Sequence, residues 1–334
     1  MLKVGLIGFG GIAKSHRLAL AKLDKCGKAR LTCAFDTHSV AFTENTVDFS
    51  SVAQDYEEKI NFYTNLEEMM KKEEIDFFIV CAPSFLHKEI TVKLLNAGYP
   101  VLCEKPMALN YSDCVKMIEA AEKSKKELMI GQCLRFYPAF DYIKSVIDEN
   151  KFGGVTGGFF SRVSPPPIRP RGNWFMNAEL SGGCLTDLHI HDVDIIRYLF
   201  GEPEAICSRA STSICKHDTV HTSFFYGGIP ITAIGDWTFI GSKFEAKCRI
   251  SFEKATITFE GGEVTVYPKD NSAPYKVELE RIGGHEGEIS YFCDIIRKER
   301  ENTKNTPESA ANTIRLIEKI RESADSSGKL IKLR

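Results

Sequence analysis

The chain has 334 residues, which is long for one globular domain and predicts two. Hydrophobic residues make up 43% of it and charged residues 26%, an ordinary composition for a protein with a large apolar core. The formal net charge is −2, and lysine and arginine are spread along the chain, so nothing indicates a nucleic-acid partner.

The chain shows no sign of export or of a membrane anchor. Its N-terminal stretch is apolar but too short and too rich in glycine to span a bilayer, and it lacks a secretory cleavage site. No later segment has the roughly 18 uninterrupted apolar residues of a membrane helix. The 11 cysteines are scattered and include no Cys-x-x-Cys pair, as is usual for buried thiols in a reducing compartment. We therefore expect a cytoplasmic protein without membrane contact.

The first part of the chain alternates between strand-like and helical segments. The strand-like segments are nearly continuous in apolar residues: Leu2–Gly8, Arg30–Phe35, Ile75–Ala82, Pro100–Cys103 and Glu127–Gly131. The helical segments are Ile12–Lys25, Glu67–Lys72, Lys88–Ala97 and Ser112–Lys125. Apolar strands that alternate with helices predict a parallel sheet covered on both faces. We expect residues 1–126 to form this α/β domain.

The pattern changes after about residue 150, within a second domain that we expect to contain residues 127–334. Its strand-like segments follow one another with short turns: Gly154–Val163, Ala205–Cys215, Thr219–Tyr226, Ile231–Phe239, Ala246–Phe252, Ala255–Phe259, Glu263–Tyr267 and Lys276–Glu280. Helical segments are Thr186–Phe200, His285–Lys298 and Pro307–Ala324. Successive strands with short turns predict a large, mainly antiparallel sheet in a second α/β domain.

A G-x-G-x-x-A sequence lies between the first strand and the first helix. Its residues are Gly8, Phe9, Gly10, Gly11, Ile12 and Ala13. The first glycine of such a sequence permits a tight turn, the second lets the backbone approach a pyrophosphate, and the alanine lets the helix pack close to the strand. The phosphates then face the positive end of the helix dipole. This context predicts a dinucleotide site.

Asp36, at the end of the second strand, indicates which dinucleotide binds. A carboxylate at this place can accept hydrogen bonds from both ribose hydroxyls of NAD and would repel a 2′-phosphate. The next three residues include no arginine or lysine to pair with such a phosphate. The sequence therefore favours NAD over NADP, although an aspartate here could also simply begin a turn.

Glu104 and Lys105 follow a buried strand, at the edge where open α/β sheets bind ligands. A lysine at such an edge can be partly desolvated, which lowers its pKa and suits it to proton transfer. Taken alone, Lys105 fits better as a surface lysine paired with Glu104.

The segment Gly182–Asp194 carries the richest set of polar side chains. On a helix, Asp187, His191 and Asp194 would share one face, so Asp187 could orient His191 for proton transfer. His189 and His191 also suggest a metal site, but residues i and i+2 of a helix point about 200° apart. We therefore expect no metal here.

Five ordered motifs together resemble the glucose–fructose oxidoreductase, inositol dehydrogenase and rhizopine-catabolism (Gfo/Idh/MocA) family of NAD(P)-dependent oxidoreductases. They are Gly8–Ala13 with His16, Ala82–His87, Glu104-Lys105-Pro106, Gly131 through Pro138 with Arg135 and Phe136, and Gly182-Gly183 with Asp187, His191 and Asp194. The resemblance covers the chain almost from end to end. It implies a Rossmann domain, followed by a domain with an open antiparallel sheet whose outer face forms a homodimer or homotetramer contact.

The resemblance also implies the roles of individual residues. Catalysis would fall to Lys105, Asp187 and His191. Besides the glycine-rich turn and Asp36, the cofactor would contact Ala82, Pro83, His87, Glu104 and Lys105. Substrate would contact Lys105, Asp187 and His191. Apart from the resemblance, we expect Arg135 and Trp174 to line the pocket and contact substrate as well. The family commonly has a cis peptide bond before the proline of its Glu-Lys-Pro motif, so Pro106 is a candidate for one.

The implied reaction is hydride transfer between NAD and a secondary alcohol of a sugar, sugar derivative or cyclitol. Either Lys105 or His191 would accept the hydroxyl proton, and the other would stabilise the developing oxyanion. Two related readings stay open: an NAD-dependent glycosidase of the same fold and a non-catalytic NAD-binding regulator.

Two features leave the substrate undefined. Relatives often have glycine where this chain has His189, a side chain that would narrow the pocket or contact substrate. The proline-rich segment Pro165–Arg171 carries Arg169 and Arg171, which suit either an anionic substrate group or plain exposure to solvent.

Overall fold

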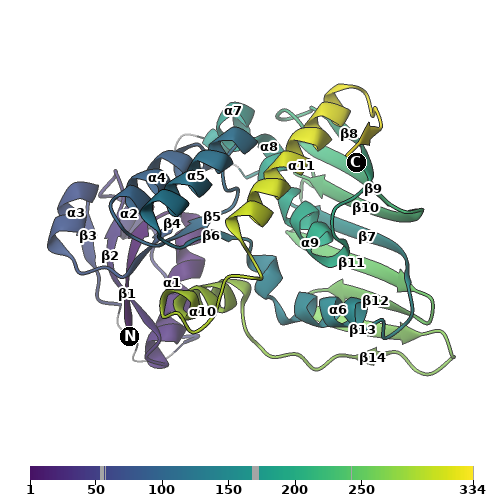
Figure 1. Cartoon of the computed structure of the whole chain (residues 1–334), viewed down its shortest axis with the longest axis horizontal. Helices are drawn as coiled ribbons and strands as arrows, with labels where there is room; N and C mark the ends of the chain where they lie inside the picture. Colours follow the sequence, from purple (N-terminus) through teal and green to yellow (C-terminus); the bar gives the residue numbers. More distant parts are fainter. Residues whose placement is uncertain (53–55, 57, 168–172, 242, 334) are drawn as a thin grey trace. The chain divides into compact units, whose positions relative to one another are not determined.

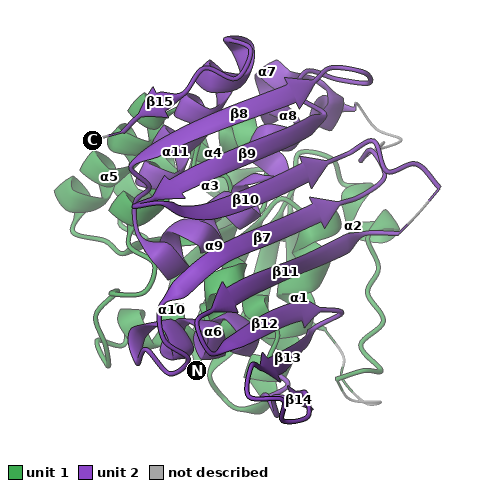
Figure 2. Cartoon of the chain, turned by 90° about the vertical axis from the view of Figure 1, so that its right-hand side faces the viewer, with its two compact units in different colours: residues 1–136, 282–311 green, residues 137–281, 312–334 purple. Residues whose placement is uncertain are grey.

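The structure is a computed structural model that describes residues 1–52, 56, 58–167, 173–241 and 243–333. The chain divides into two compact units (Figure 2). Unit 1 contains residues 1–136 and 282–311, and unit 2 contains residues 137–281 and 312–334. The sequence predicted a first domain of residues 1–126 and a second of residues 127–334.

Unit 1 is built on a parallel sheet of six strands in the order β3-β2-β1-β4-β5-β6 (Figure 1). The strands are β1 Leu2–Ile7, β2 Ala29–Phe35, β3 Asn61–Tyr63, β4 Phe77–Val80, β5 Val101–Glu104 and β6 Leu128–Gly131. Every residue of β4, β5 and β6 is buried, which explains their continuous apolar sequences. The strand order is that of the doubly wound dinucleotide-binding fold, as the sequence predicted.

The helical segments of unit 1, apart from the last two in chain order, connect these strands. They are α1 Gly11–Lys25, α2 Ala41–Glu44, α3 Leu66–Lys72, η1 Ser84–Leu86, α4 His87–Asn96, α5 Tyr111–Ser124, η2 Cys133–Phe136 and α10 Gly284–Ile296. Two helix starts are set by asparagine side chains: Asn65 accepts a hydrogen bond from the backbone of Glu68, and Asn110 accepts one from Asp113.

Helix α10 belongs to unit 1 because its apolar face completes the core there. Ile289 and Phe292 lie in one buried cluster with Leu6 of β1 and Leu20 of α1. The Phe292 ring meets the Phe77 ring edge to face, with centroids 5.4 Å apart. The sequence pattern identifies α10 as a helix but carries no signal of which sheet it covers.

Unit 2 is built on a mixed, mostly antiparallel sheet of nine strands in the order β14-β13-β12-β11-β7-β10-β9-β8-β15. The strands are β7 Val155–Val163, β8 Ala205–Ser211, β9 Thr219–Tyr226, β10 Ile229–Asp236, β11 Glu245–Phe252, β12 Ala255–Glu260, β13 Glu263–Pro268, β14 Tyr275–Lys276 and β15 Ile331–Lys332. Among its described strands, only the β7–β10 pair is parallel. The large antiparallel sheet predicted for this part is therefore confirmed.

The helices of unit 2 gather on one face of its sheet. They are α6 Pro138–Asp148, η3 Trp174–Met176, α7 Ala178–Ser181, α8 Gly183–Asp187, α9 Ile190–Phe200 and α11 Pro307–Asp325, whose first turn is counted with unit 1. Figure 2 views the sheet from the other face, with α6 and α9 behind it. Residues on the helix side of the strands are buried, as the alternating burial of β9 and β10 shows.

Several sequence predictions differ from the structure. The expected helix Thr186–Phe200 is two helices, α8 and α9, separated by a turn at Leu188 and His189. The expected strand Lys276–Glu280 is a two-residue strand, Tyr275–Lys276. The terminal Ile331–Lys332, which carried no strand signal, pairs with β8.

The structure also bears on the cysteines and on membrane-spanning helices. All 11 cysteines fall in the described part of the chain and are free thiols. Within the described residues, no helix combines the length and the hydropathy needed to cross a bilayer.

An ion pair between Arg162 and Asp192 ties α9 to the central strand β7. Arg162 Nε donates to Asp192 Oδ2 at 2.9 Å and Arg162 Nη2 donates to Oδ1 at 3.2 Å, with both side chains buried. Such a bidentate contact fixes orientation as well as distance.

We predict that Arg162→Ala destabilises the protein by about 3–5 kcal/mol, because it leaves the Asp192 carboxylate buried without its cation. Chemical denaturation of the variant measures this loss. The double variant Arg162→Met with Asp192→Leu removes both charges and should be more stable than Arg162→Ala alone. Equal stability of Arg162→Ala and the unmodified chain would contradict the prediction.

Candidate functional site

The glycine-rich turn leaves β1 at the centre of the unit 1 sheet. Gly8 has φ +87°, and a Cβ atom on it would lie 2.7 Å from the carbonyl oxygen of Cys81. The Gly8 amide donates to Phe35 O at 2.8 Å, and the Cys81 amide donates to Ile7 O at 2.7 Å. The turn is therefore held by the strands on both sides, and only glycine fits at its first position.

The residues after Gly8 present backbone to solvent at the start of α1. Gly10 is the N-cap of α1 without a side-chain cap, and no atom lies within 4 Å of where its Cβ would be. Gly11 and Ile12 are exposed, whereas Phe9 and Ala13 are fully buried. The amide groups of the first turn thus face open space at the positive end of a 15-residue helix, which suits a pyrophosphate.

Asp36 follows β2 beside this turn. Its Oδ2 atom accepts a hydrogen bond from the Phe9 amide at 2.9 Å, and its Oδ1 atom accepts one from the His38 amide at 3.0 Å. The side chain is 18% exposed, so its oxygens also remain open to a ligand. The carboxylate is thereby fixed next to the glycine-rich turn, where a ribose would lie.

Ala82 and Pro83 follow β4 and are partly exposed, but His87 is buried. The ring of His87 contacts two carbonyl oxygens, with Nδ1 2.7 Å from Pro106 O and Nε2 2.8 Å from Ala82 O. Burial lowers the pKa of His87, so the ring is neutral near pH 7 and donates to one of the two. The structure therefore makes His87 a link between two loops, and its geometry gives no support to the predicted direct contact with cofactor.

Glu104 and Lys105 end strand β5. The Glu104 side chain is buried, with Oε1 2.7 Å from His16 Nε2, and its Oε2 accepts the Lys105 amide at 3.0 Å. Burial is the largest single influence and favours the neutral acid, but the hydrogen bond with His16 and the electrostatic attraction of His16, His285 and Lys105 together outweigh it and lower the pKa of Glu104. Lys105 is partly exposed after four buried strand residues, and the Lys105–Pro106 bond is cis, as the resemblance implies.

These segments share one edge of the unit 1 sheet. Gly8, Asp36, Ala82 and Lys105 follow β1, β2, β4 and β5, and all four strands are parallel. The carboxyl ends of parallel strands meet at one edge, where open α/β sheets bind their ligands. The predicted dinucleotide residues and Lys105 are therefore brought together within unit 1.

In unit 2, Asp187 and His191 stand out by exposure. Between Ser181 and Arg197 they are partly exposed, and every other residue of the stretch is buried. The turn between α8 and α9 separates them, so the single helical face that the sequence predicted is wrong. Asp194, expected on that face, is buried and accepts a hydrogen bond from Thr313 Oγ1 at 2.8 Å.

His189 lies in the core of unit 2 and does not reach a surface. Its Nε2 atom is 2.9 Å from Thr222 Oγ1, and burial lowers its pKa to about 3, so the ring is neutral. A Cβ atom on Gly235 would lie 2.7 Å from His189 Cβ, so the strand needs glycine there to admit the ring. The prediction that His189 narrows the pocket or contacts substrate is therefore wrong.

Arg135 and Trp174, two further residues predicted to contact substrate, differ from each other in burial. Arg135 is buried in unit 1, where its guanidinium donates to Lys304 O and Ser309 Oγ, each at 3.0 Å. These contacts anchor Arg135 within unit 1, and its contact with substrate stays a prediction. Trp174 is partly exposed and stacks on Phe175, with ring centroids 3.9 Å apart. Arg169 and Arg171 lie outside the described residues.

Sequence reasoning missed a group of polar side chains next to Glu104, all buried except the partly exposed His285. The His285 Nε2 atom is 3.8 Å from Glu104 Oε1, and the His285 ring meets the His16 ring edge to face. Glu288 is fully buried one turn further along α10. The available signal was the spacing His285-x-x-Glu288, which puts an imidazole and a carboxylate on one side of a helix.

Comparison with known proteins agrees with this geometry. Residues 2–132 match the family model described as "Oxidoreductase family, NAD-binding Rossmann fold", and residues 140–258 match the GFO/IDH/MocA C-terminal domain. The chain belongs to the Gfo/Idh/MocA oxidoreductase family. Its first unit is thus an NAD-binding Rossmann domain, as predicted.

Individual members of the family share about a third or less of their residues with this chain. The chain is 30% identical to 2,7-anhydro-N-acetylneuraminate hydratase of Escherichia coli K12, over 62% of this chain and 52% of that protein. It is 28% identical to glucose-6-phosphate 3-dehydrogenase of Bacillus subtilis 168, over 64% of this chain and 59% of that protein. Aldose–aldose oxidoreductase of Caulobacter crescentus, solved with glycerol, has the same fold, with TM-score 0.83, 21% identity and 99% of each chain covered.

We predict that Asp36→Ala weakens NAD binding about tenfold or more, because it removes a charged acceptor beside the ribose site and the contact with the Phe9 amide. Asp36→Asn is the matched variant, since it keeps an acceptor oxygen and removes the charge. It should bind NAD more tightly than Asp36→Ala and discriminate less against NADP. Calorimetric titration with both dinucleotides measures this, and unchanged discrimination in both variants would contradict it.

Proposed function

We propose that this protein is an NAD-dependent dehydrogenase that moves a hydride between the nicotinamide and a secondary alcohol of a sugar, sugar derivative or cyclitol. The observation that carries the proposal is the shared edge of the unit 1 sheet. There the glycine-rich turn after β1 and Asp36 after β2 suit NAD, and the partly exposed Lys105 follows β5.

The acid–base groups that we propose are Lys105 of unit 1 and His191 of unit 2. When NAD is bound, its nicotinamide ring supplies the hydride acceptor. One of the two side chains takes the proton of the substrate hydroxyl, and the other stabilises the developing oxyanion. Asp187, four residues before His191, orients the imidazole. The partial exposure of Asp187 and His191 in an otherwise buried stretch supports these roles.

The hydrogen bond from the Lys105 amide to Glu104 Oε2 supports the role of Lys105. It fixes the backbone of Lys105 to a buried carboxylate, so the side chain of Lys105 starts from a rigidly held position. Accurate placement of an acid–base group is a large part of its catalytic effect.

The substrate class is proposed from the relatives. The Bacillus subtilis relative is named for a phosphorylated sugar, and the structural relative from Caulobacter crescentus is named for aldoses. We propose a polyol or sugar with adjacent hydroxyl groups as the substrate of this chain.

We predict that NAD⁺ is reduced by one class within a panel of inositols, aldoses, sugar acids and amino sugars. Lys105→Met and His191→Asn should each lower kcat/KM about 100-fold or more, the usual contribution of a positioned acid–base group. NAD binding should change little in His191→Asn. The exposed Lys72→Met on α3 is the control and should retain full activity. Near-normal turnover in both Lys105→Met and His191→Asn would contradict the assignment of roles.

A second candidate function has support from one relative. The Escherichia coli relative is named a hydratase, a reaction without net oxidation. A protein of this fold that oxidises its substrate transiently, such as an NAD-dependent glycosidase, would retain its cofactor and release no NADH. Dinucleotide binding without turnover of any substrate would instead indicate a non-catalytic regulator. Product analysis by NMR in the same panel separates the three.

We also propose that the open face of the unit 2 sheet joins copies of the chain into a homodimer or homotetramer. This face carries apolar residues on alternate strand positions, among them the partly exposed Phe159 and Ile234 and the exposed Phe225 and Tyr267. The free thiols suit a reducing compartment, and we propose the cytoplasm.

We predict that Ile234→Asp shifts the protein towards monomers, because a charge would be desolvated at the centre of the contact. Light scattering coupled to size exclusion measures the mass in solution. Lys319→Gln on α11, away from the sheet, should leave the mass unchanged. A monomeric unmodified protein would refute the proposed contact.

A further inference from the structure

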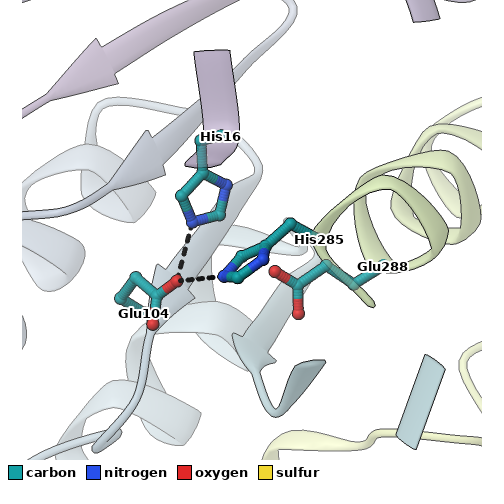
Figure 3. Close-up of side chains that lie close together, drawn as sticks. All are labelled: His16, Glu104, His285 and Glu288. Atoms are coloured by element: carbon teal, nitrogen blue, oxygen red, sulfur yellow. Dashed lines mark hydrogen bonds and ion pairs between the residues drawn. The ribbon is translucent and has the colours of Figure 1, made fainter. Parts of the chain in front are cut away.

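Four ionisable side chains lie close together inside unit 1, at the carboxyl end of β5 (Figure 3). His16 comes from α1, Glu104 from β5, and His285 and Glu288 from α10. One donor atom of each, two imidazole nitrogens and two carboxylate oxygens, lies within 4.8 Å of all the others. We call these residues the His–Glu cluster; three of them are buried, and His285 is partly exposed.

Glu288 lacks hydrogen-bond partners for its whole carboxyl group, and the buried Nδ1 atom of His16 also has none. The Glu288 side chain has no exposed surface, and neither carboxylate oxygen has a hydrogen-bond partner. Figure 3 shows the carboxylate beside the His285 ring, within the cluster. A proton on Glu288 would not satisfy the carboxyl group, because the resulting O–H would also need an acceptor. A buried carboxyl group of this kind calls for a further bound species.

The charges of the cluster identify that species. Glu104 and Glu288 bring two carboxylates into one buried space. A neutral imidazole has a lone pair to donate to a cation, and His16 and His285 bring two imidazoles to the same place. Burying two carboxylates together is costly unless a cation accompanies them. One divalent cation balances both.

The donor set indicates which cation fits. Two imidazole nitrogens and two carboxylate oxygens suit zinc and the neighbouring transition metals, whereas calcium and magnesium prefer oxygen alone. Donors of a tetrahedral zinc ion lie about 3.3 Å apart, given bonds of about 2.0 Å. From Glu104 Oε1, His16 Nε2 lies at 2.7 Å and His285 Nε2 at 3.8 Å, on either side of that value.

We propose that His16, Glu104, His285 and Glu288 bind one zinc ion, or a similar divalent transition metal, as a structural site. All four donors come from the protein, as in closed structural zinc sites. The ion joins α1, β5 and α10, three segments far apart in the chain. Glu104 also accepts a hydrogen bond from the Lys105 amide, so the ion holds the backbone of Lys105 in place. The site goes beyond the proposed dehydrogenase function and does not depend on it.

The test measures bound metal in the full chain, purified without an affinity tag because histidine tags bind zinc themselves. After incubation with zinc sulfate and removal of excess metal, mass spectrometry should find about one zinc per chain. Competition with a chromophoric chelator should show that Glu288→Gln binds zinc at least about tenfold more weakly, since even partners outside the ligand shell matter by about 10–100-fold. His285→Asn should show the same loss.

The control is Glu286→Gln, which changes a glutamate on the same helix that pairs with Lys22 and is outside the cluster. It should keep its zinc. Two results would overturn the proposal: a zinc-free unmodified chain after incubation, or equal zinc content in Glu288→Gln and the unmodified chain. Neither readout uses turnover, so a zinc-free protein that still reduces NAD⁺ would refute this site and leave the dehydrogenase proposal intact.

Discussion

The carboxylate of Glu104 connects the parts of unit 1 on which the rest of the site depends. One oxygen meets His16 of α1, and the other accepts the amide of Lys105. The same carboxylate faces His285 of α10. A buried carboxylate is tolerated only with such partners, so the position of the helix that follows the glycine-rich turn and the position of Lys105 are set by one group. The dinucleotide turn and the proposed acid–base lysine therefore form one rigid arrangement.

Local patterns predicted much of this arrangement. Gly8–Ala13 lies between a strand and a helix that follow directly in sequence, so its role depends on neighbouring residues alone. The position of Lys105 is also predictable from neighbouring residues, because it directly follows a buried strand. The return of α10 to the first unit escaped prediction because an amphipathic helix does not reveal which sheet it covers. The His–Glu cluster escaped with it, since its members meet only after that helix is in place.

The second unit shows a different limit. Residues 186–200 have helical spacing throughout, yet the helix breaks at Leu188 and His189. There the ring of His189 enters the core, where Gly235 on β10 leaves room for it. The two residues depend on each other across the sheet, a relation that a single sequence does not reveal. Since His189 is sequestered, His191 is the histidine of this segment that keeps partial exposure.

The placement of α10 has a consequence for synthesis of the chain. A ribosome releases all six strands of the first sheet before residue 132, but Ile289 and Phe292, which cover its core, emerge only after the whole of β7 to β14. Until then the apolar surface that they cover, including Leu6, Leu20 and Phe77, stays open to water or to chaperones. Closing so long a loop is slow compared with local helix formation. The nucleotide-binding half, although first in sequence, is therefore completed late in folding.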